Sequence, residues 1–227
     1  MLSKIEPLLL GFSAFLFAYS LDQSTQPLYC LFVGTSVFLY YVIPRKPQSI
    51  WIYLSLALFL FLILHFGNYK IPFPFLIPLV LLSVLYPWLR EITSVKTPII
   101  ALSWTFIMMS AWTQILGFET LIKATVLFLF FLVLAVSSDV KDRHNDAPSL
   151  GTIPQIIPWY MLRWVLLSLI FILILLIWIW VPQWNLGVVF FSLFSSFFIL
   201  KNWKQPFALP LDPGLLLFAL GNLIDYL

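Results

Sequence analysis

Apolar runs of membrane-spanning length follow one another along almost the entire chain. A helix needs about 20 apolar residues to cross the hydrocarbon core of a bilayer, with about 17 as the lower end. Nine runs close to this length can be marked in the 227-residue sequence. They lie at residues 7–22, 26–44, 50–67, 71–88, 97–116, 119–138, 158–182, 186–201 and 210–227. The sequence therefore predicts an all-α fold, a polytopic membrane bundle of nine transmembrane helices.

The composition indicates the same class. Charged residues make up 9% of the chain and hydrophobic residues 62%, whereas a soluble domain carries roughly 25% charged residues. The mean hydropathy is +1.03. The net charge of +3 comes from basic residues spread over the loops, so no nucleic-acid-binding patch is predicted. No repeat or linker divides the chain, which indicates a single membrane domain over residues 1–227.

The basic residues predict an orientation in the membrane. With nine helices and a cytoplasmic N-terminus, ten of the twelve Lys and Arg residues fall at the cytoplasmic side. Only Lys70 and Lys123 fall outside, and an excess of basic residues in cytoplasmic loops is the usual rule. We therefore expect a cytoplasmic N-terminus and an external C-terminus. The ten are Lys4, Arg45, Lys46, Arg90, Lys96, Lys141, Arg143, Arg163, Lys201 and Lys204.

A dense charged segment separates the sixth apolar run from the seventh. Three of the nine carboxylates of the chain, Asp139, Asp142 and Asp146, stand at i, i+3 and i+7 within it. On a helix these acids share one face and repel one another, unless a cation such as Mg²⁺ lies between them. Lys141 and Arg143 flank the acids and could hold phosphate oxygens. The spacing alone also allows a solvated cytoplasmic loop without a site.

The segment contains a recognisable motif. Asp142-Arg143-x-x-Asp146, followed by Gly151-Thr152-Ile153-Pro154, resembles the second aspartate motif of the UbiA-type intramembrane prenyltransferases. The resemblance implies a nine-helix bundle around a central cavity that opens toward the cytoplasmic leaflet. It implies that the acids bind Mg²⁺ on an isoprenyl diphosphate. The enzyme would then transfer the isoprenyl group to a lipophilic acceptor, expected to be aromatic.

A second segment is similar to the same family. After the fourth run, Tyr86, Arg90 and Lys96 resemble the Tyr-and-Lys segment that contacts the diphosphate. Fixed cations suit a diphosphate leaving group because they stabilise the charge that develops on it. Tyr41 and Tyr86 are expected to line the substrate pocket, where their ring faces could shield an allylic cation.

The chain departs from the family at the first aspartate motif. That motif should follow the second run, but no Asp, Glu or Asn occurs between Asp22 and Asn68. We therefore expect a single Mg²⁺ on Asp139, Asp142 and Asp146. Either Arg45 and Lys46 supply positive charge directly to the diphosphate in place of the second metal, or the protein has lost prenyl transfer and kept the fold.

Two alternatives to the enzyme remain. The first is a non-catalytic protein of the UbiA fold that binds an isoprenoid lipid or serves as a membrane assembly partner, because a fold does not decide a function. The second is a small transporter, which is disfavoured because the predicted spans hold almost no ionisable groups at mid-membrane depth.

The family pattern also predicts where the site lies. The ends of the second, fourth and sixth runs should converge on the cytoplasmic face. There they should bring Arg45, Tyr86, Lys96 and Asp142 around one cavity.

Overall fold

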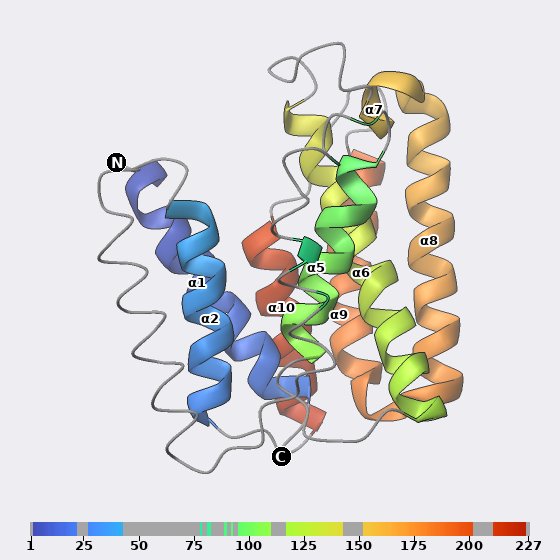
Figure 1. Ribbon diagram of the computed structural model, residues 1–227. Coiled ribbons are helices and arrows are strands. Elements are labelled where there is room, and N and C mark those ends of the chain that lie inside the picture. The colour runs from blue at the N-terminus through green and yellow to red at the C-terminus, as the bar shows by residue number, and fades with distance from the viewer. Residues whose placement is uncertain are drawn as a thin grey trace.

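Every regular element in the described part of the chain is a helix (Figure 1). The computed structural model describes residues 2–21, 27–42, 95–109, 117–142, 152–201 and 211–225, together with residues 78, 81, 82, 89 and 92. The elements are α1 (Leu2–Leu21), α2 (Pro27–Val42), α5 (Lys96–Met109), α6 (Phe118–Asp142), α7 (Ile153–Ile156), α8 (Trp159–Trp180), the short 3-10 helix η4 (Pro182–Trp184), α9 (Asn185–Lys201) and α10 (Leu211–Asp225).

The all-α class is thus confirmed for the residues that the structure describes. Seven of the nine predicted runs coincide with described helices. The run at 50–67 lies outside the described residues, and only residues 78, 81 and 82 of the run at 71–88 are described. Within this part, three helical stretches are long and apolar enough to cross a membrane: Phe118–Val140, Trp159–Trp180 and Pro182–Lys201. These stretches are compatible with a membrane protein, and the full count of nine spans stays a prediction.

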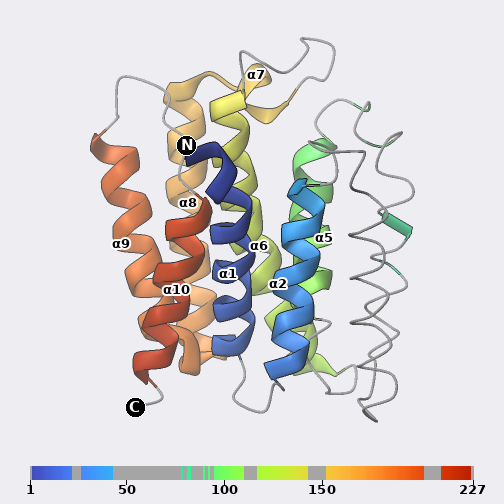
Figure 2. The ribbon, with the colours of Figure 1, turned by 90° about the vertical axis from the view of Figure 1, so that its left-hand side faces the viewer.

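The helices stand side by side, and successive helices run in opposite directions (Figures 1 and 2). The two chain ends consequently lie at opposite ends of the bundle. The first turn of α5 meets the last turn of α6 at the end where α1 begins. We call this end the Lys96 end, after the first residue of α5, and the opposite end the Phe118 end, after the first residue of α6.

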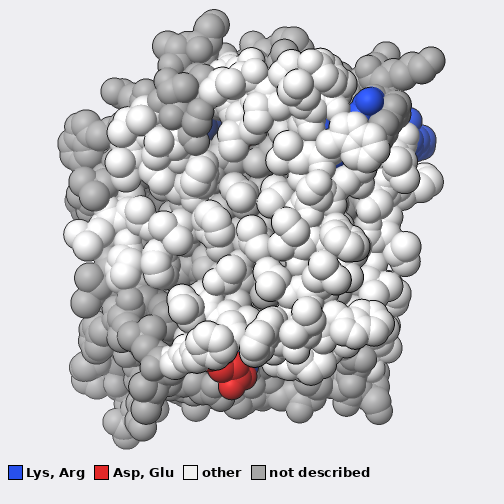
Figure 3. Space-filling model, turned by 90° about the vertical axis from the view of Figure 1, so that its right-hand side faces the viewer, with Lys and Arg blue, Asp and Glu red and all other residues white. Residues whose placement is uncertain are grey.

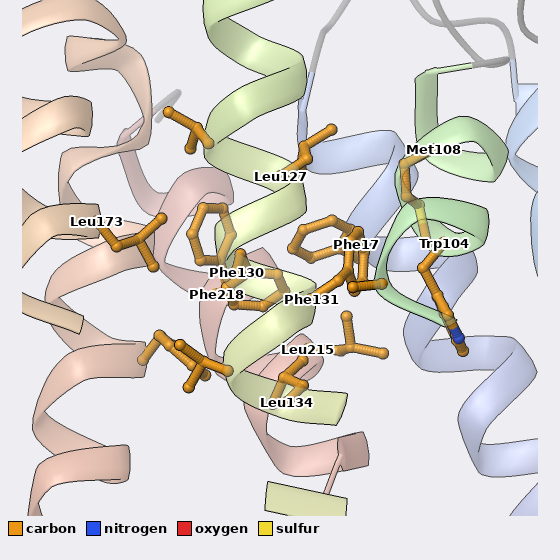
Figure 4. Packing of buried hydrophobic residues seen from close by; sticks show 14 of the residues in the cluster. Phe17, Trp104, Met108, Leu127, Phe130, Phe131, Leu134, Leu173, Leu215 and Phe218 are labelled. Atoms are coloured by element: carbon orange, nitrogen blue, oxygen red, sulfur yellow. The ribbon is translucent and has the colours of Figure 1, made fainter. Parts of the chain in front are cut away.

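An aromatic cluster fills the region where α1, α6 and α10 meet (Figure 4). The Phe17 ring lies 5.2 Å from the Phe130 ring and 5.1 Å from the Phe218 ring, between centroids. Helix α5 joins the cluster through Trp104, whose ring lies 5.4 Å from that of Phe131. Such ring pairs contribute about 0.5–1.5 kcal/mol each beyond the area they bury. The cluster therefore holds the first and last helices of the chain against its middle.

Small residues allow two helix pairs to approach closely. A Cβ atom on Gly34 of α2 would lie 2.7 Å from the carbonyl oxygen of Gly11 in α1. A Cβ atom on Gly221 of α10 would lie 2.6 Å from the Cα atom of Gly187 in α9. Close backbone approach through glycine is a common way for helices to associate in lipid, where no hydrophobic force drives them together.

The surface on the α8 side is apolar over its middle. Figure 3 shows basic side chains near the top and acidic side chains near the bottom, with uncharged residues between them. Helix α8 exposes Phe171 and Trp178, the latter to 68%, along a face that no other described element covers. An exposed apolar face of this extent is expected of a helix that faces lipid.

Candidate functional site

The first turn of α5 and the last turn of α6 form a buried polar cluster at the Lys96 end. The Thr97 hydroxyl donates a hydrogen bond to Oδ2 of Asp139. The ammonium Nζ of Lys96 lies 3.4 Å from the other carboxylate oxygen, Oδ1. We call Lys96, Thr97 and Asp139 the Lys96–Asp139 cluster. It joins two segments that are 42 residues apart in the sequence.

The three side chains of the Lys96–Asp139 cluster are largely buried, so their contacts with one another affect the stability of the fold. The side chain of Asp139 is 5% exposed and that of Lys96 is 15% exposed, while Thr97 is completely buried. A buried charge destabilises the fold unless it is paired and hydrogen-bonded. Here the carboxylate has a cation on one oxygen and a hydroxyl donor on the other. Each member of the cluster therefore depends on the others for its place in the structure.

The helix ends add to this dependence. Asp139 lies in the last turn of α6, where the negative end of the helix dipole disfavours a carboxylate. Lys96 is the first residue of α5, where the positive end of the dipole disfavours an ammonium group. The Asp139 carboxylate lies against the first turn of α5, where the positive end of that helix dipole stabilises it. Its negative charge in turn stabilises the Lys96 ammonium. The ion pair is thus the arrangement that two unfavourably placed charges are expected to adopt.

The structure brings together two of the predicted site residues, Lys96 and Asp139. Asp142 is the last residue of α6 and follows Asp139 at i+3, so the two acids start from the same face of one helix. The remaining predicted residues are outside the described residues, or have side chains that the structure does not describe. They are Arg45, Arg90, Arg143, Asp146 and Tyr86 in the first group, and Tyr41, Lys141 and the side chain of Asp142 in the second.

The cluster bears on the predicted magnesium site. Both carboxylate oxygens of Asp139 are engaged by residues of α5. Among the side chains that the structure describes, no three His, Cys, Asp or Glu residues lie close enough together to hold a metal ion. Asp139 is thus a counter-ion of Lys96 in this structure. The predicted Mg²⁺ on Asp139, Asp142 and Asp146 stays a prediction, because the structure does not describe the side chains of Asp142 and Asp146.

The second half of the motif begins the next element. Thr152 precedes the short helix α7, and its backbone N–H donates to Oε1 of Gln155 at 2.9 Å. Pro154 lies in the first turn of α7, where its missing N–H leaves no hydrogen bond unmade. Thr152 is fully buried. The motif is therefore an ordered helix start that leads from the charged segment into α8.

A groove between α5 and α6 lies toward the Phe118 end and was not predicted. Its volume is about 350 Å³. The hydroxyls of Thr105 and Thr125 in its wall donate to carbonyl oxygens of their own helices, at 2.8 Å and 2.9 Å. The wall consequently offers an apolar surface. The residues that line it include Leu102, Phe106, Met109, Leu121, Ala124 and Phe128.

Sequence reasoning missed one residue of the site, Thr97. Its hydroxyl directly follows Lys96 in the chain, but nothing in the local pattern distinguishes it from Thr105, which bonds its own helix. Its role depends on a contact with a residue 42 positions away, which the local sequence does not show.

No protein-family model, no curated protein and no solved structure matches this chain. Two observations on the chain itself bear on its function. One is the motif-like sequence that follows Asp139, and the other is the ion pair between Asp139 itself and Lys96.

Proposed function

We propose that this protein is an integral membrane prenyltransferase of the UbiA kind. It would transfer an isoprenyl group from a diphosphate donor to a lipophilic acceptor. The observation that carries the proposal is the contact between Lys96 and Asp139 at 3.4 Å. The sequence motifs assign Lys96 and the acidic segment separately to one diphosphate site. The contact supports that assignment because it brings the two segments to the same end of the bundle.

The proposed chemistry needs a fixed cation at a site with little water. The bond between the allylic carbon and the diphosphate oxygen breaks, and the electron pair leaves with the diphosphate. The acceptor forms a new bond to that carbon and loses a proton. Lys96, largely buried beside apolar helices, would stabilise the developing negative charge more strongly than an exposed lysine could. Mg²⁺ held by Asp139, Asp142 and Asp146 would supply further positive charge to the diphosphate.

One observation favours the non-catalytic alternative. Lys96 and Asp139 neutralise each other in the present structure, and the sequence lacks acids between Asp22 and Asn68. Such a site could hold the head group of an isoprenoid lipid without breaking the bond between the head group and the isoprenoid chain. The two functions differ in whether metal is required, because a lipid carrier has no leaving group to stabilise.

Calorimetric titration tests the proposal. A non-reactive S-thiolo analogue of geranylgeranyl diphosphate is titrated into the purified protein, once with Mg²⁺ and once with a chelator. We expect the analogue to bind with Mg²⁺ and to bind at least about tenfold more weakly with the chelator, because removing the cation removes a charge-assisted contact to the diphosphate worth about 1.4 kcal/mol or more. Replacing both Asp142→Ala and Asp146→Ala should abolish binding.

A matched charge control is available at the Phe118 end. Lys123 forms an ion pair with Glu119 at 2.6 Å, far from the proposed site. Lys96→Gln should weaken binding of the analogue about tenfold, as loss of one partner in a charged hydrogen bond commonly does, while Lys123→Gln should leave it unchanged. Equal affinity with metal and with chelator would refute the metal role. No binding under either condition would leave the non-catalytic alternative.

A further inference from the structure

We propose that the groove between α5 and α6 holds one acyl chain of a bilayer phospholipid, which enters from the leaflet at the Phe118 end. The inference does not rest on the proposed function, because Lys96 and Asp139 lie at the opposite end of the bundle. The observation behind it is an apolar hollow of about 350 Å³ whose mouth lies on the outer surface of α6.

The groove is open along one ridge of α6. Gly117, Leu121 and Thr125 line it at i, i+4 and i+8, and residues with this spacing share a face of a helix. We call these three residues the Leu121 ridge. All three are exposed, Leu121 to 65%, whereas Thr105 and Met109 of α5 are buried in the inner wall. A ligand therefore reaches the groove sideways, from the surroundings of the bundle.

The groove runs along the helices for about the depth of one leaflet. The lining residues extend from Leu102 to Met109 on α5 and from Gly117 to Phe128 on α6, or about 10 Å and about 16 Å at the rise of an α-helix. Half of a hydrocarbon core is about 15 Å thick. The Glu119 side chain is 69% exposed, and a carboxylate this exposed belongs at the boundary between membrane and water. A chain that enters beside the first turn of α6 thus lies parallel to the helices, as lipid chains do.

The groove wall suits hydrocarbon better than water. The hydroxyls of Thr105 and Thr125 donate to carbonyl oxygens of their own helices, and most of the other lining residues are apolar, among them Phe106 and Phe128. A trapped water needs two to four polar partners, so an apolar hollow stays dry. An empty hollow forfeits the van der Waals contacts of its walls. A hydrocarbon chain restores these contacts.

The groove is continuous with the surface that is expected to face lipid. On the other side of the Leu121 ridge lies a recess of about 140 Å³ between α6 and α8, which is lined also by Leu176 and Trp180. Trp180 is 50% exposed and belongs to the helix whose outer face carries Phe171 and Trp178. The groove mouth therefore opens onto bilayer lipid, and the bilayer is the source of the chain.

The first turns of α6 do not select a charged head group. Their charged side chains, Glu119 and Lys123, pair with each other at 2.6 Å. Phosphatidylcholine, which is zwitterionic, is therefore a suitable probe.

Photolabelling tests the proposal. The purified protein is incubated in detergent with a phosphatidylcholine whose acyl chain carries a diazirine, washed with lipid-free detergent, irradiated and mapped by mass spectrometry. We expect label on Phe106 and Phe128 to persist through the washes, because a chain in the groove contacts two helices at once. Label on Phe171 should be lost, since lipid there packs against an open surface. Equal loss from both places would overturn the proposal.

The position of the diazirine reports the direction of the chain. A diazirine near the glycerol should label the groove at Met109 and Leu121, and one near the terminal methyl should label it at Leu102 and Phe128. The opposite order would show that a chain enters from the Lys96 end, as the tail of an isoprenyl diphosphate would. That result would overturn the proposal.

Ala124→Phe places a ring in the groove. Ala124 is small and partly buried in the groove wall, so this variant should lose the retained label from Phe106 and Phe128. Val165→Phe is the matched control, because Val165 is exposed on α8, and it should retain as much label as the wild type. Unchanged label in a folded Ala124→Phe protein would overturn the proposal. If Ala124→Phe does not fold, the diazirine positions decide the question, since they need only the wild type.

The S-thiolo analogue of geranylgeranyl diphosphate separates this groove from the proposed prenyl site. Saturating analogue with Mg²⁺ should leave the retained label unchanged. Displacement of the label would assign the groove to the donor chain and overturn the proposal, while it would support the proposed function. A protein that retains the label but binds no analogue would support the lipid site and remove the proposed function.

Discussion

Trp184 is a single side chain that joins two distant parts of the bundle. Its indole N–H donates to the carbonyl oxygen of Leu21, the last residue of α1, at 3.1 Å. Trp184 is fully buried, and its ring lies against that of Phe218. The last carbonyls of a helix lack partners within the helix, and this bond gives one of them a buried donor.

Trp184→Phe should therefore destabilise the protein. Removing the donor leaves the Leu21 carbonyl unpaired, which typically costs about 1–3 kcal/mol. The thermal midpoint in detergent should fall by about 2–4 °C for each kcal/mol. Trp178→Phe is the control, because Trp178 is largely exposed on α8. Equal midpoints for the two variants would contradict the role of the hydrogen bond.

Gly221 tests the close approach of α9 and α10. A Cβ atom there would lie 2.6 Å from both the Cα and the backbone nitrogen of Gly187, and backbone atoms cannot move aside as a flexible side chain can. Gly221→Ala should cost about 1–3 kcal/mol, the usual range for overpacking. Gly214→Ala is the control, since its Cβ would first meet the end of the Leu134 side chain, at 3.1 Å. Thermal unfolding distinguishes them, and a Gly221→Ala variant as stable as Gly214→Ala would contradict the packing.

At the residue scale, the sequence predicted part of the site. Lys96 and Asp139 could be named because charged residues between apolar runs are few, and each stood in a motif-like segment. Their direct pairing could not be predicted, since it depends on how α5 and α6 pack. The buried hydroxyl of Thr97 and the backbone carbonyl of Leu21 gain their partners only through tertiary structure.

At the scale of helices, the apolar runs were a good guide to position. Backbone groups in lipid must bond within the segment, so a long apolar run predicts a helix. The predicted run 119–138 corresponds to α6, which extends to Asp142 and so carries two of the three predicted metal ligands. Which helices touch could not be predicted in the same way. Runs that are apolar on all sides do not indicate which face is buried.

Helix α8 allows a direct test of a lipid-facing surface. Phe171 is exposed on the outer face of α8, and Leu173 is fully buried two residues later. In a Cys30→Ser background, which removes the only native thiol, a spin label is attached at Phe171→Cys or at Leu173→Cys. Oxygen, which concentrates in lipid, should relax the label at 171 much more than the label at 173. Stronger relaxation at 171 by a water-soluble nickel complex would contradict a lipid-facing helix.

At the scale of the whole molecule, the described helices form an alternating bundle with the chain termini at opposite ends (Figures 1 and 2). An odd number of spans places the termini on opposite sides of a membrane, and the count of nine stays a prediction. Lys96, Arg163 and Lys201 lie near helix ends at the Lys96 end of the bundle. The positive-inside rule would place that end in the cytoplasm.

Reporter fusions test the predicted orientation. Fusions at Lys46 and Asn145 should report a cytoplasmic position, and a fusion at the C-terminus should report an external one. Lys46 and Asn145 follow the second and sixth predicted runs, so both results depend on the count of spans. An external signal at Asn145 would contradict the topology and would place the acidic segment on the wrong side for a cytoplasmic diphosphate.

Product formation is the most direct test of the central claim that the Lys96 end transfers an isoprenyl group. The purified protein, in nanodiscs with Mg²⁺, is given radiolabelled isoprenyl diphosphates of several chain lengths and a lipid extract from its host. We predict release of inorganic diphosphate together with label in a new lipid, and roughly tenfold or greater loss of both in Lys96→Gln, as expected for a group that stabilises the transition state. Tight binding of the donor with no release of diphosphate, for every chain length and extract, would contradict the account.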